Sequence, residues 1–84
     1  MILCWHEQAW EDYLFFQATD KRLMKRVNDL IKDIQRQPFS GLGKPEPLKF
    51  NWAGFWSRRV NEEHRLVYTL KEGRLIIAAC RYHY

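Results

Sequence analysis

The stretch FWSRRVNEEHRLVYTLKEGRLIIAACRY, residues 55–82, contains the pattern that decides the fold. It holds three segments in which apolar side chains recur at every second position, the spacing of a β-strand. The segments are 55–60, 64–70 and 74–82. The connections at 61–63 and 71–73 have the length of three-residue hairpin loops, and Gly73 lies where a positive φ is required. The sequence therefore predicts three consecutive antiparallel strands.

The loop lengths also predict a register. Three-residue loops pair Leu70 with Arg74 and place Arg65 opposite Arg59. Alternation along each strand then divides the side chains between two faces. The open face is expected to carry Ser57, Arg59, Arg65, Val67, Thr69, Arg81 and His83. The buried face is expected to carry Val60, Leu66, Tyr68, Leu70, Ile76, Ala78, Cys80 and Tyr82. A slip of one residue would exchange the faces of a strand, so the grouping depends on the loops.

The first half of the chain predicts a strand and two helices. Residues 2–5 form a short apolar run, and a helical pattern begins near Glu7. The apolar face of this first helix is expected to hold Trp10, Tyr13, Leu14 and Gln17. Thr19 or Asp20 is suited to cap a second helix, which should end at Gln37 because a proline follows. Its apolar stripe consists of Leu23, Val27, Leu30, Ile31 and Ile34. The short gap predicts an antiparallel helix hairpin that packs on the buried face of the strands.

The length, net charge and apolar content of the chain limit the class of protein. A chain of 84 residues is expected to form a single domain, residues 1–84, with one core. Its net charge of +4 is typical of proteins that meet nucleic acid, acidic proteins or anionic membranes, and does not choose among them. No apolar run approaches the roughly 18 residues that a membrane helix needs. Residues 1–5 also lack the basic region of a signal peptide, so the expected location is the cytoplasm.

Cys4 and Cys80 are the two cysteines of the chain. Neither lies in a CxxC or Cys/His spacing, which argues against a zinc site. Two reduced, largely buried thiols are the favoured interpretation for a cytosolic protein, and a disulfide or redox role is the alternative.

The residues after the second helix suggest a metal-free cleavage of RNA. The segment 38–47 is a loop broken by glycines and prolines, and Leu48–Phe50 is expected to be a short strand. RNA cleavage needs a base for the ribose 2′-OH, an acid for the departing 5′ oxygen and cations for the phosphorane. Glu46 and His83 are candidates for the base and the acid. The cations and binding groups would come from Arg59, Arg65, Lys49 and Tyr84.

Each of these residues also has an ordinary interpretation. Taken alone, Glu46 is more typical of a solvated loop carboxylate, and a histidine near a chain end is usually incidental. Arg58, Arg59 and Arg65 are also suited to solvate an edge or to pair with Glu62 and Glu63. His6 and His64 are expected to be structural or exposed. The four tryptophans are expected to lie in the core or in an interface rather than to stack on RNA bases. The basic residues of the second helix are expected to face solvent rather than to contact ribosomal RNA. Only the combination points to a nuclease.

Five blocks of the sequence resemble the YoeB group of the RelE-type toxins of bacterial type II toxin–antitoxin pairs. The blocks are 19–22, 43–49, 54–59, 62–68 and 78–84, and the resemblance runs along the whole chain. It implies an α+β fold in which two N-terminal helices pack on a twisted antiparallel β-sheet. It also implies an endoribonuclease, an mRNA interferase, that acts on mRNA in the A site of the 70S ribosome and contacts 16S rRNA.

The resemblance assigns roles to residues as well. The family pattern makes Glu46 the general base, His83 the general acid and Arg65 the group that stabilises the transition state. Lys49, Arg59 and Tyr84 match positions that hold the scissile phosphate. The resemblance implies no metal or other cofactor, a homodimer, and silencing by a YefM-type antitoxin. Two alternatives remain: a ribosome- or RNA-binding module without catalysis, and a toxin of the same fold directed at another macromolecule such as a topoisomerase.

Overall fold

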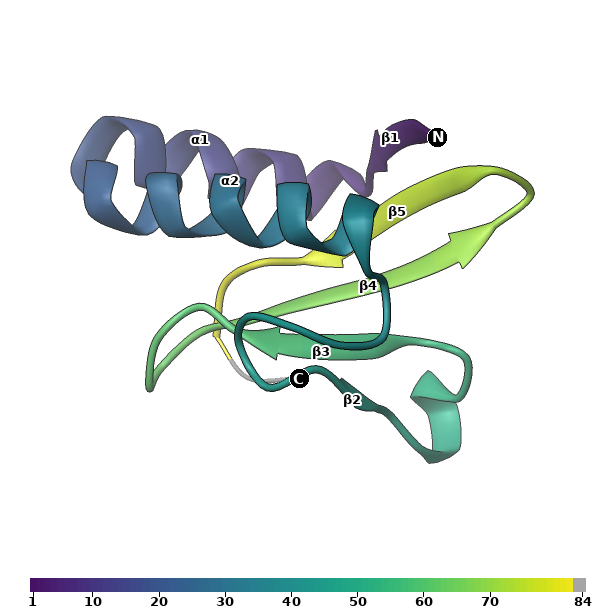
Figure 1. The fold of residues 1–84 in the computed structure, drawn as a ribbon. Coiled ribbons are helices and arrows are strands. Elements are labelled where there is room, and N and C mark those ends of the chain that lie inside the picture. Colours follow the sequence, from purple (N-terminus) through teal and green to yellow (C-terminus); the bar gives the residue numbers. More distant parts are fainter. Residues whose placement is uncertain (83–84) are drawn as a thin grey trace.

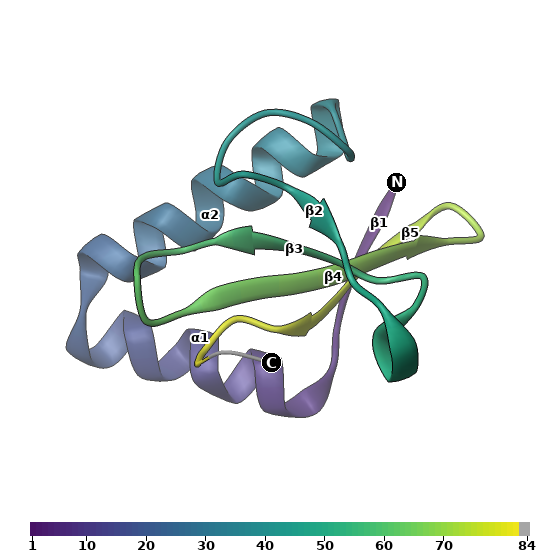
Figure 2. The same cartoon turned by 90° about the horizontal axis from the view of Figure 1, so that it is seen from below.

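The computed structural model describes residues 1–82, so His83 and Tyr84 lie outside the described residues. The elements are β1 (Ile2–Trp5), α1 (Glu7–Thr19), α2 (Lys21–Arg36), β2 (Glu46–Pro47), the 3₁₀ turn η1 (Phe50–Trp52), β3 (Trp56–Arg59), β4 (Arg65–Lys71) and β5 (Arg74–Ala79). Within residues 1–82 the strands form one five-stranded sheet in the order β1-β5-β4-β3-β2. The two helices lie antiparallel on one side of it (Figures 1 and 2), so the α+β prediction is confirmed.

Helix α2 follows the sequence pattern closely. The side chain of Asp20 accepts hydrogen bonds from the backbone N–H groups of Arg22 and Leu23, at 3.1 and 3.2 Å, so the predicted cap is present. The helix ends at Arg36, with Gln37 as its C-cap, as the following proline predicts. The buried apolar residues of α2 are Val27, Leu30, Ile31 and Ile34. The predicted stripe is therefore the face that packs on the sheet.

Helix α1 buries a different face from the predicted one. Its buried residues are Ala9 and Phe16, whereas Trp10 is 44% and Leu14 39% exposed. The small Ala9 lets the helix approach the end of the sheet so closely that its carbonyl oxygen lies 3.5 Å from the Sγ atom of Cys80. Large aromatic rings cannot occupy that position. Trp10 instead packs edge-on against Trp5, with the ring centroids 5.5 Å apart, and stacks on Tyr13 at 5.6 Å.

The β3–β4 hairpin has the predicted register, with Arg59 paired to Arg65. The β4–β5 hairpin does not, because Lys71 pairs with Arg74 and Leu70 with Leu75. Glu72 and Gly73 both have positive φ, 52° and 74°, which is the geometry of a two-residue turn. The prediction that Leu70 pairs with Arg74 was therefore wrong by one residue.

That slip exchanges the faces of β5. Leu75 and Ile77 are fully buried, whereas the predicted core residues Ile76 and Ala78 are only half-buried. An irregularity next to Val67 and Tyr68 then inserts one extra residue into the ladder, since Tyr68 pairs with Ile77 but Val67 with Ala79. This extra residue restores the predicted burial of Cys80, which is 0% exposed.

The two edge strands complete the sheet. β1 pairs with β5 in parallel, so the sheet is mixed rather than wholly antiparallel. β2 pairs with β3 through Glu46–Ser57 and Pro47–Trp56. The predicted strand at Leu48–Phe50 is absent, because Phe50 has a φ of 56° and begins the turn η1.

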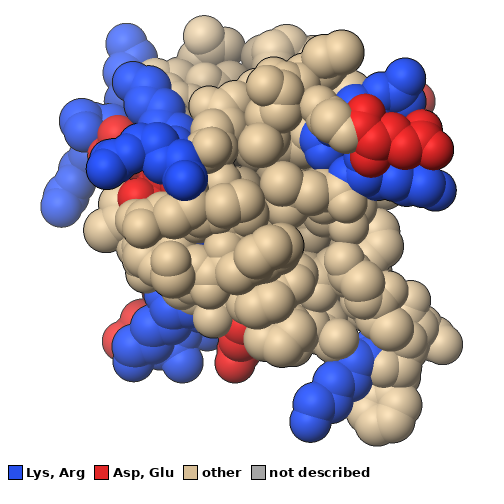
Figure 3. Space-filling view, turned by 45° about the vertical axis from the view of Figure 1, so that its right-hand side comes forward, with Lys and Arg blue, Asp and Glu red and all other residues tan. Residues whose placement is uncertain are grey.

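The surface is unevenly charged. In the view of Figure 3, Lys and Arg side chains gather at the margins of a broad and largely uncharged centre. Within the described range, 1–82, neither helix combines the length and the apolar character needed to cross a membrane.

Candidate active site

Three of the predicted site residues share one face of the sheet. Glu46 pairs with Ser57 on β3, and Arg59 pairs with Arg65 on β4. Paired residues point to the same side, and residues two apart on a strand do so as well, so Ser57 links Glu46 to Arg59. The next residue, Arg58, points to the opposite side and is fully buried toward the helices. Glu46, Arg59 and Arg65 therefore lie on the face directed away from the helix pair.

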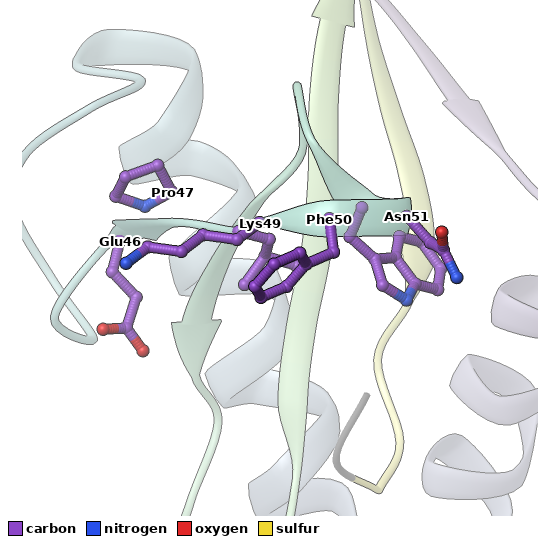
Figure 4. A pocket seen from close by; sticks show the side chains of 7 residues that line it. Glu46, Pro47, Lys49, Phe50 and Asn51 are labelled. Atoms are coloured by element: carbon purple, nitrogen blue, oxygen red, sulfur yellow. The ribbon is translucent and has the colours of Figure 1, made fainter.

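A hollow adjoins this face and is lined by residues 46–52. Its volume is about 450 Å³, and Figure 4 shows Glu46 and Lys49 at one end, Phe50 at its centre and Asn51 at the other end. Phe50 is 91% exposed. Within residues 1–82 the side chains of Glu46, Lys49 and Arg59 are exposed and make no hydrogen bond or ion pair among themselves or with others. The hollow thus combines a carboxylate, a cation and a bare aromatic ring.

A buried arginine holds the loop that leads to Glu46. Arg58 is 0% exposed, and its Nη1 donates to Oδ2 of Asp33 at 2.6 Å and to the carbonyl oxygen of Leu42 at 3.0 Å. Its Nη2 donates to the carbonyl oxygens of Gln37 and Ser40, at 2.6 and 2.7 Å. The guanidinium therefore binds one carboxylate and three loop carbonyls at once. The prediction that Arg58 solvates an edge or pairs with Glu62 and Glu63 was wrong.

Asp33 is the acidic partner of this buried group. The backbone N–H of Leu42, the side-chain amide of Gln37 and the guanidinium of Arg58, in that order, lower the pKa of Asp33 from 3.8 to about 2. The carboxylate is therefore charged at neutral pH and neutralises the buried cation. The pair was not predicted from the sequence, although alternation with Val60, a predicted core residue, already places Arg58 on the buried face.

A second set of contacts presses the same loop against β3. The N–H of Arg59 donates to the carbonyl oxygen of Gly43 at 2.7 Å. Gly43 has a φ of 80°, and a Cβ atom there would lie 2.9 Å from Cδ2 of Leu30 and 3.1 Å from the carbonyl oxygen of Arg59. Only glycine fits this close approach with this backbone conformation. The chain then runs through Lys44, with a φ of 53°, to Glu46.

Arg65 is fixed by the turn that precedes β4. Its Nη1 donates to the carbonyl oxygens of Asn61 at 2.6 Å and of His64 at 3.0 Å. The carbonyl oxygen of Glu62 lies farther, at 3.4 Å. The guanidinium is half-buried and restrained at the end of the strand pair, where an anion can approach it. A restrained guanidinium is suited to bind a phosphate without first losing side-chain freedom.

The segment after β5 differs from the prediction. Arg81 was expected on the open face, but its guanidinium lies 4.0 Å from the ring centroid of Phe15 and 3.6 Å from Oδ1 of Asp12, both on α1. Tyr82 was expected in the core and is 54% exposed. Because β5 ends at Ala79 and Tyr82 has a φ of 64°, strand alternation no longer sets the direction of these two side chains. His83 and Tyr84 lie outside the described residues, so their predicted roles stay predictions.

The titratable groups near this segment do not form a metal site. Among residues 1–82, no three His, Cys, Asp or Glu side chains are arranged to hold a metal ion. Both cysteines are free thiols, with Cys80 buried and Cys4 half-buried. Burial, together with the nearby carboxylate of Asp12, raises the pKa of Cys80 to about 12. Cys80 is therefore a neutral packing residue at physiological pH.

The described arrangement can bind a phosphate and accept a proton. Arg59 and Arg65 offer planar donors that match phosphate oxygens, and Lys49 adds a cation at the hollow. The exposed carboxylate of Glu46 can act as a base toward a hydroxyl held beside them. These groups come from β2, the segment that follows it, β3 and β4, and the buried contacts of Arg58 and Gly43 hold the Glu46 segment in place.

Comparison with known proteins gives matches along the whole chain. A family model described as "YoeB-like toxin of bacterial type II toxin-antitoxin system" matches residues 5–84. Toxin YoeB of Escherichia coli K12 is 63% identical over 84 residues, with 100% of both chains covered. The structure of a YoeB/ParE toxin from Agrobacterium tumefaciens has a TM-score of 0.96 at 52% identity, with 100% of both chains covered.

Two further similar structures come from Staphylococcus aureus. A YoeB–YefM complex has a TM-score of 0.93 at 47% identity, and a YoeB dimer has a TM-score of 0.93 at 48% identity. Each comparison covers 100% of this chain and 98% of the other.

Proposed function

The chain belongs to the YoeB-like toxins of bacterial type II toxin–antitoxin systems, and on that premise we propose that it is a ribosome-dependent endoribonuclease that cuts mRNA in the A site. The observation that carries this proposal is the strand pairing that sets Glu46, Arg59 and Arg65 on one face. A carboxylate and two guanidiniums on one surface supply the proton acceptor and the anion site that cleavage of a phosphodiester requires.

In the proposed reaction Glu46 takes the proton of the ribose 2′-OH, and the 2′ oxygen then forms a bond to phosphorus. Arg65 stabilises the negative charge that builds on the phosphorane oxygens. The bond between phosphorus and the 5′ oxygen breaks, and His83 gives this leaving oxygen its proton. The products are a 2′,3′-cyclic phosphate and a 5′-hydroxyl. DNA has no 2′-OH and is therefore not cut.

Lys49, Arg59 and Tyr84 are proposed to hold the scissile phosphate and its neighbours. Lys49 and Arg59 are exposed and make no ion pair within residues 1–82, so they are available to phosphate oxygens. Phe50 lies next to Lys49 in the hollow, is 91% exposed and offers a flat ring to a nucleobase. The net charge of +4 favours approach to RNA and to the 16S rRNA of the ribosome.

We also propose a homodimer and a YefM-type antitoxin as partners, and the cytoplasm as the location. The similar protein of Staphylococcus aureus is known both as a YoeB dimer and in a YoeB–YefM complex. Exposed apolar side chains on β1 and α1 provide the kind of surface that a protein partner covers, Ile2 at 63% and Trp10 at 44% exposure among them.

Primer extension on mRNA from cells that express the chain tests the proposed activity. The expected result is a cut at A-site codons, which disappears in Glu46→Gln. Glu11→Gln is the matched control, because Glu11 is an exposed carboxylate on α1. The absence of cuts with the unaltered chain, or undiminished cutting by Glu46→Gln, would refute the proposal.

The alternative is a toxin that occupies the ribosome without cleaving RNA. The described residues supply a phosphate-binding surface but only one of the two proton-transfer groups, and such a surface can bind RNA by itself. Arrested translation with intact mRNA in the same primer extension would favour this alternative.

A further inference from the structure

We propose that His64 is a positioning residue for the catalytic tail, a role that rests on the proposed function. His64 holds the backbone of Tyr82, the residue that precedes the proposed acid, His83, in the chain. It touches neither RNA nor the reacting atoms. Its contribution is to fix the point from which the last two residues start.

The backbone of Tyr82 is bound on both sides. Its N–H donates to Nδ1 of His64 at 2.7 Å, and its carbonyl oxygen accepts from the N–H of Arg65 at 3.0 Å. We call this pair of hydrogen bonds the Tyr82 clamp. Because one of its members is Arg65, the clamp joins the start of the tail directly to the residue proposed to bind the phosphorane.

The imidazole that forms the clamp is itself held firmly. His64 is 6% exposed, and its ring centroid lies 5.3 Å from that of Phe16 in the core. Its backbone N–H donates to Oδ1 of Asn61 at 2.7 Å. Since Nδ1 accepts a hydrogen bond, the ring proton sits on Nε2, which lies 3.5 Å from Oε1 of Glu63. A buried imidazole in one tautomer therefore presents a fixed acceptor to Tyr82.

The chain needs this clamp at Tyr82 in particular. The residues just before it are fixed by packing, since Cys80 is buried and the Arg81 guanidinium lies 4.0 Å above the Phe15 ring. Tyr82 is 54% exposed and has a φ of 64°, a left-handed conformation that residues other than glycine adopt rarely. Its ring packs edge-on against that of His64, with the centroids 5.6 Å apart, and lies 4.7 Å from the Arg81 guanidinium. The two hydrogen bonds hold its backbone beside Arg65.

A general acid must lie within hydrogen-bonding reach of the oxygen that it protonates. Displacement by about 1 Å costs roughly 100-fold in rate. Loss of the clamp should therefore lower kcat, with a much smaller effect on KM, because Lys49, Arg59 and Arg65 remain in place to bind RNA.

The test compares two variants in a single-substrate cleavage assay on programmed ribosomes. His64→Leu keeps an apolar side chain but removes the acceptor, and we expect kcat to fall about 100-fold. His64→Asn places an amide oxygen near the position of Nδ1, and we expect kcat within about tenfold of the unaltered chain. His6→Leu is the control, since His6 is exposed and its side chain makes no cap hydrogen bond.

A modified substrate separates positioning of the acid from a general structural defect. When sulfur replaces the 5′ bridging oxygen, the thiolate leaves without a proton, so the acid is not needed. On this substrate the kcat of His64→Leu should be less than about threefold below that of the unaltered chain, because a misplaced acid no longer limits the reaction. A defect that stays undiminished on this substrate would contradict the proposal, as would equal kcat values of His64→Leu and the unaltered chain.

Hydrogen exchange at the Tyr82 amide tests the clamp without any catalysis. The amide should exchange slowly in the unaltered chain and in His64→Asn, and at the rate of an unprotected amide in His64→Leu. An unprotected amide in the unaltered chain would overturn the clamp even if His64→Leu failed to fold. An unaltered chain that protects this amide but cuts no RNA would refute the proposed function, and the catalytic role of His64 with it.

Discussion

Nη1 of Arg58 lies 2.6 Å from Oδ2 of Asp33, and both side chains are buried beneath the face that carries Glu46. This ion pair joins the end of α2 to β3. Through its further hydrogen bonds, Arg58 also binds the carbonyl oxygens of the loop between them, at Gln37, Ser40 and Leu42. The loop that ends at Glu46 is therefore held from inside the protein, while its far side stays open to a ligand.

The first prediction concerns the stability that this buried pair provides. Arg58→Met should lower the free energy of unfolding by about 3 kcal/mol or more, because it leaves the Asp33 carboxylate and three carbonyl oxygens without their shared donor. Urea denaturation measures this. Arg59→Met is the matched control, since Arg59 is exposed, and it should change the free energy of unfolding by less than about 0.5 kcal/mol. Equal changes in the free energy of unfolding for the two substitutions would show that the buried contacts of Arg58 add no stability.

The second prediction concerns pH. The pKa of Asp33 falls from 3.8 to about 2 on folding, so the unfolded chain binds more protons than the folded one between these values. The stability that Asp33 contributes is therefore complete above about pH 4 and lost as the pH falls toward 2. Urea midpoints measured from pH 5 to pH 2 should fall more steeply for the unaltered chain than for Asp33→Asn. Parallel curves would contradict the assigned pKa.

The third prediction concerns the proposed transition state. Arg65→Ala should raise the barrier to RNA cleavage by about 3 kcal/mol, roughly 100-fold in kcat, by analogy with the loss of one oxyanion donor. Arg59→Ala should act mainly on KM, because Arg59 is proposed to bind the phosphate rather than to stabilise the charge that develops. Single-turnover rates at saturating ribosome concentration separate the two effects. A tenfold effect or less for Arg65→Ala would reduce Arg65 to a binding residue.

The fourth prediction concerns Phe50, which is 91% exposed and has a φ of 56°. An exposed ring in a left-handed conformation adds nothing to the core, so Phe50→Gly should raise the free energy of unfolding by about 1 kcal/mol. The same substitution should weaken binding of single-stranded RNA by about 1 to 2 kcal/mol, because a stacking surface is lost. Phe50→Trp should keep the binding.

Fluorescence anisotropy with a labelled RNA whose 2′ positions are methylated measures this binding without cleavage. If Phe50→Gly binds as tightly as the unaltered chain, the ring does not contact RNA. In that case we expect Phe50 to contact a protein partner instead. The unaltered chain and Phe50→Gly should then bind a YefM-type antitoxin with different affinities.

Much of the fold follows from local pattern. Asp20 caps α2, the stripe from Val27 to Ile34 faces the sheet, and the Arg59–Arg65 pairing follows from the length of the first hairpin loop. The second hairpin shows where such reasoning fails. Glu72 adopts the left-handed conformation together with Gly73, and a non-glycine residue in this conformation is not visible in the sequence pattern. One residue of slip then moved Leu75 and Ile77 into the core.

The candidate site was predictable to a similar extent. Glu46, Arg59 and Arg65 reach one face because the first hairpin register was predicted correctly and because β2 pairs with β3. The supporting residues were not predicted. Strand alternation places Arg58 on the buried face, but a charged side chain is buried only when it is paired, and its partner Asp33 lies 25 residues away, where no local pattern connects the two. Arg81 packs on α1 because β5 ends at Ala79, and no local pattern marks that end.

The most direct test of the account is cleavage of one mRNA in programmed ribosomes, with and without a 2′-OH at the A-site codon. We predict that the unaltered chain cuts the all-ribose message, that the fragments carry a 2′,3′-cyclic phosphate and a 5′-hydroxyl, and that a single 2′-deoxy substitution before the scissile phosphate abolishes the cut. Cleavage of the 2′-deoxy message at an undiminished rate would show that no 2′ oxygen attacks, and would contradict the role of Glu46 as its base.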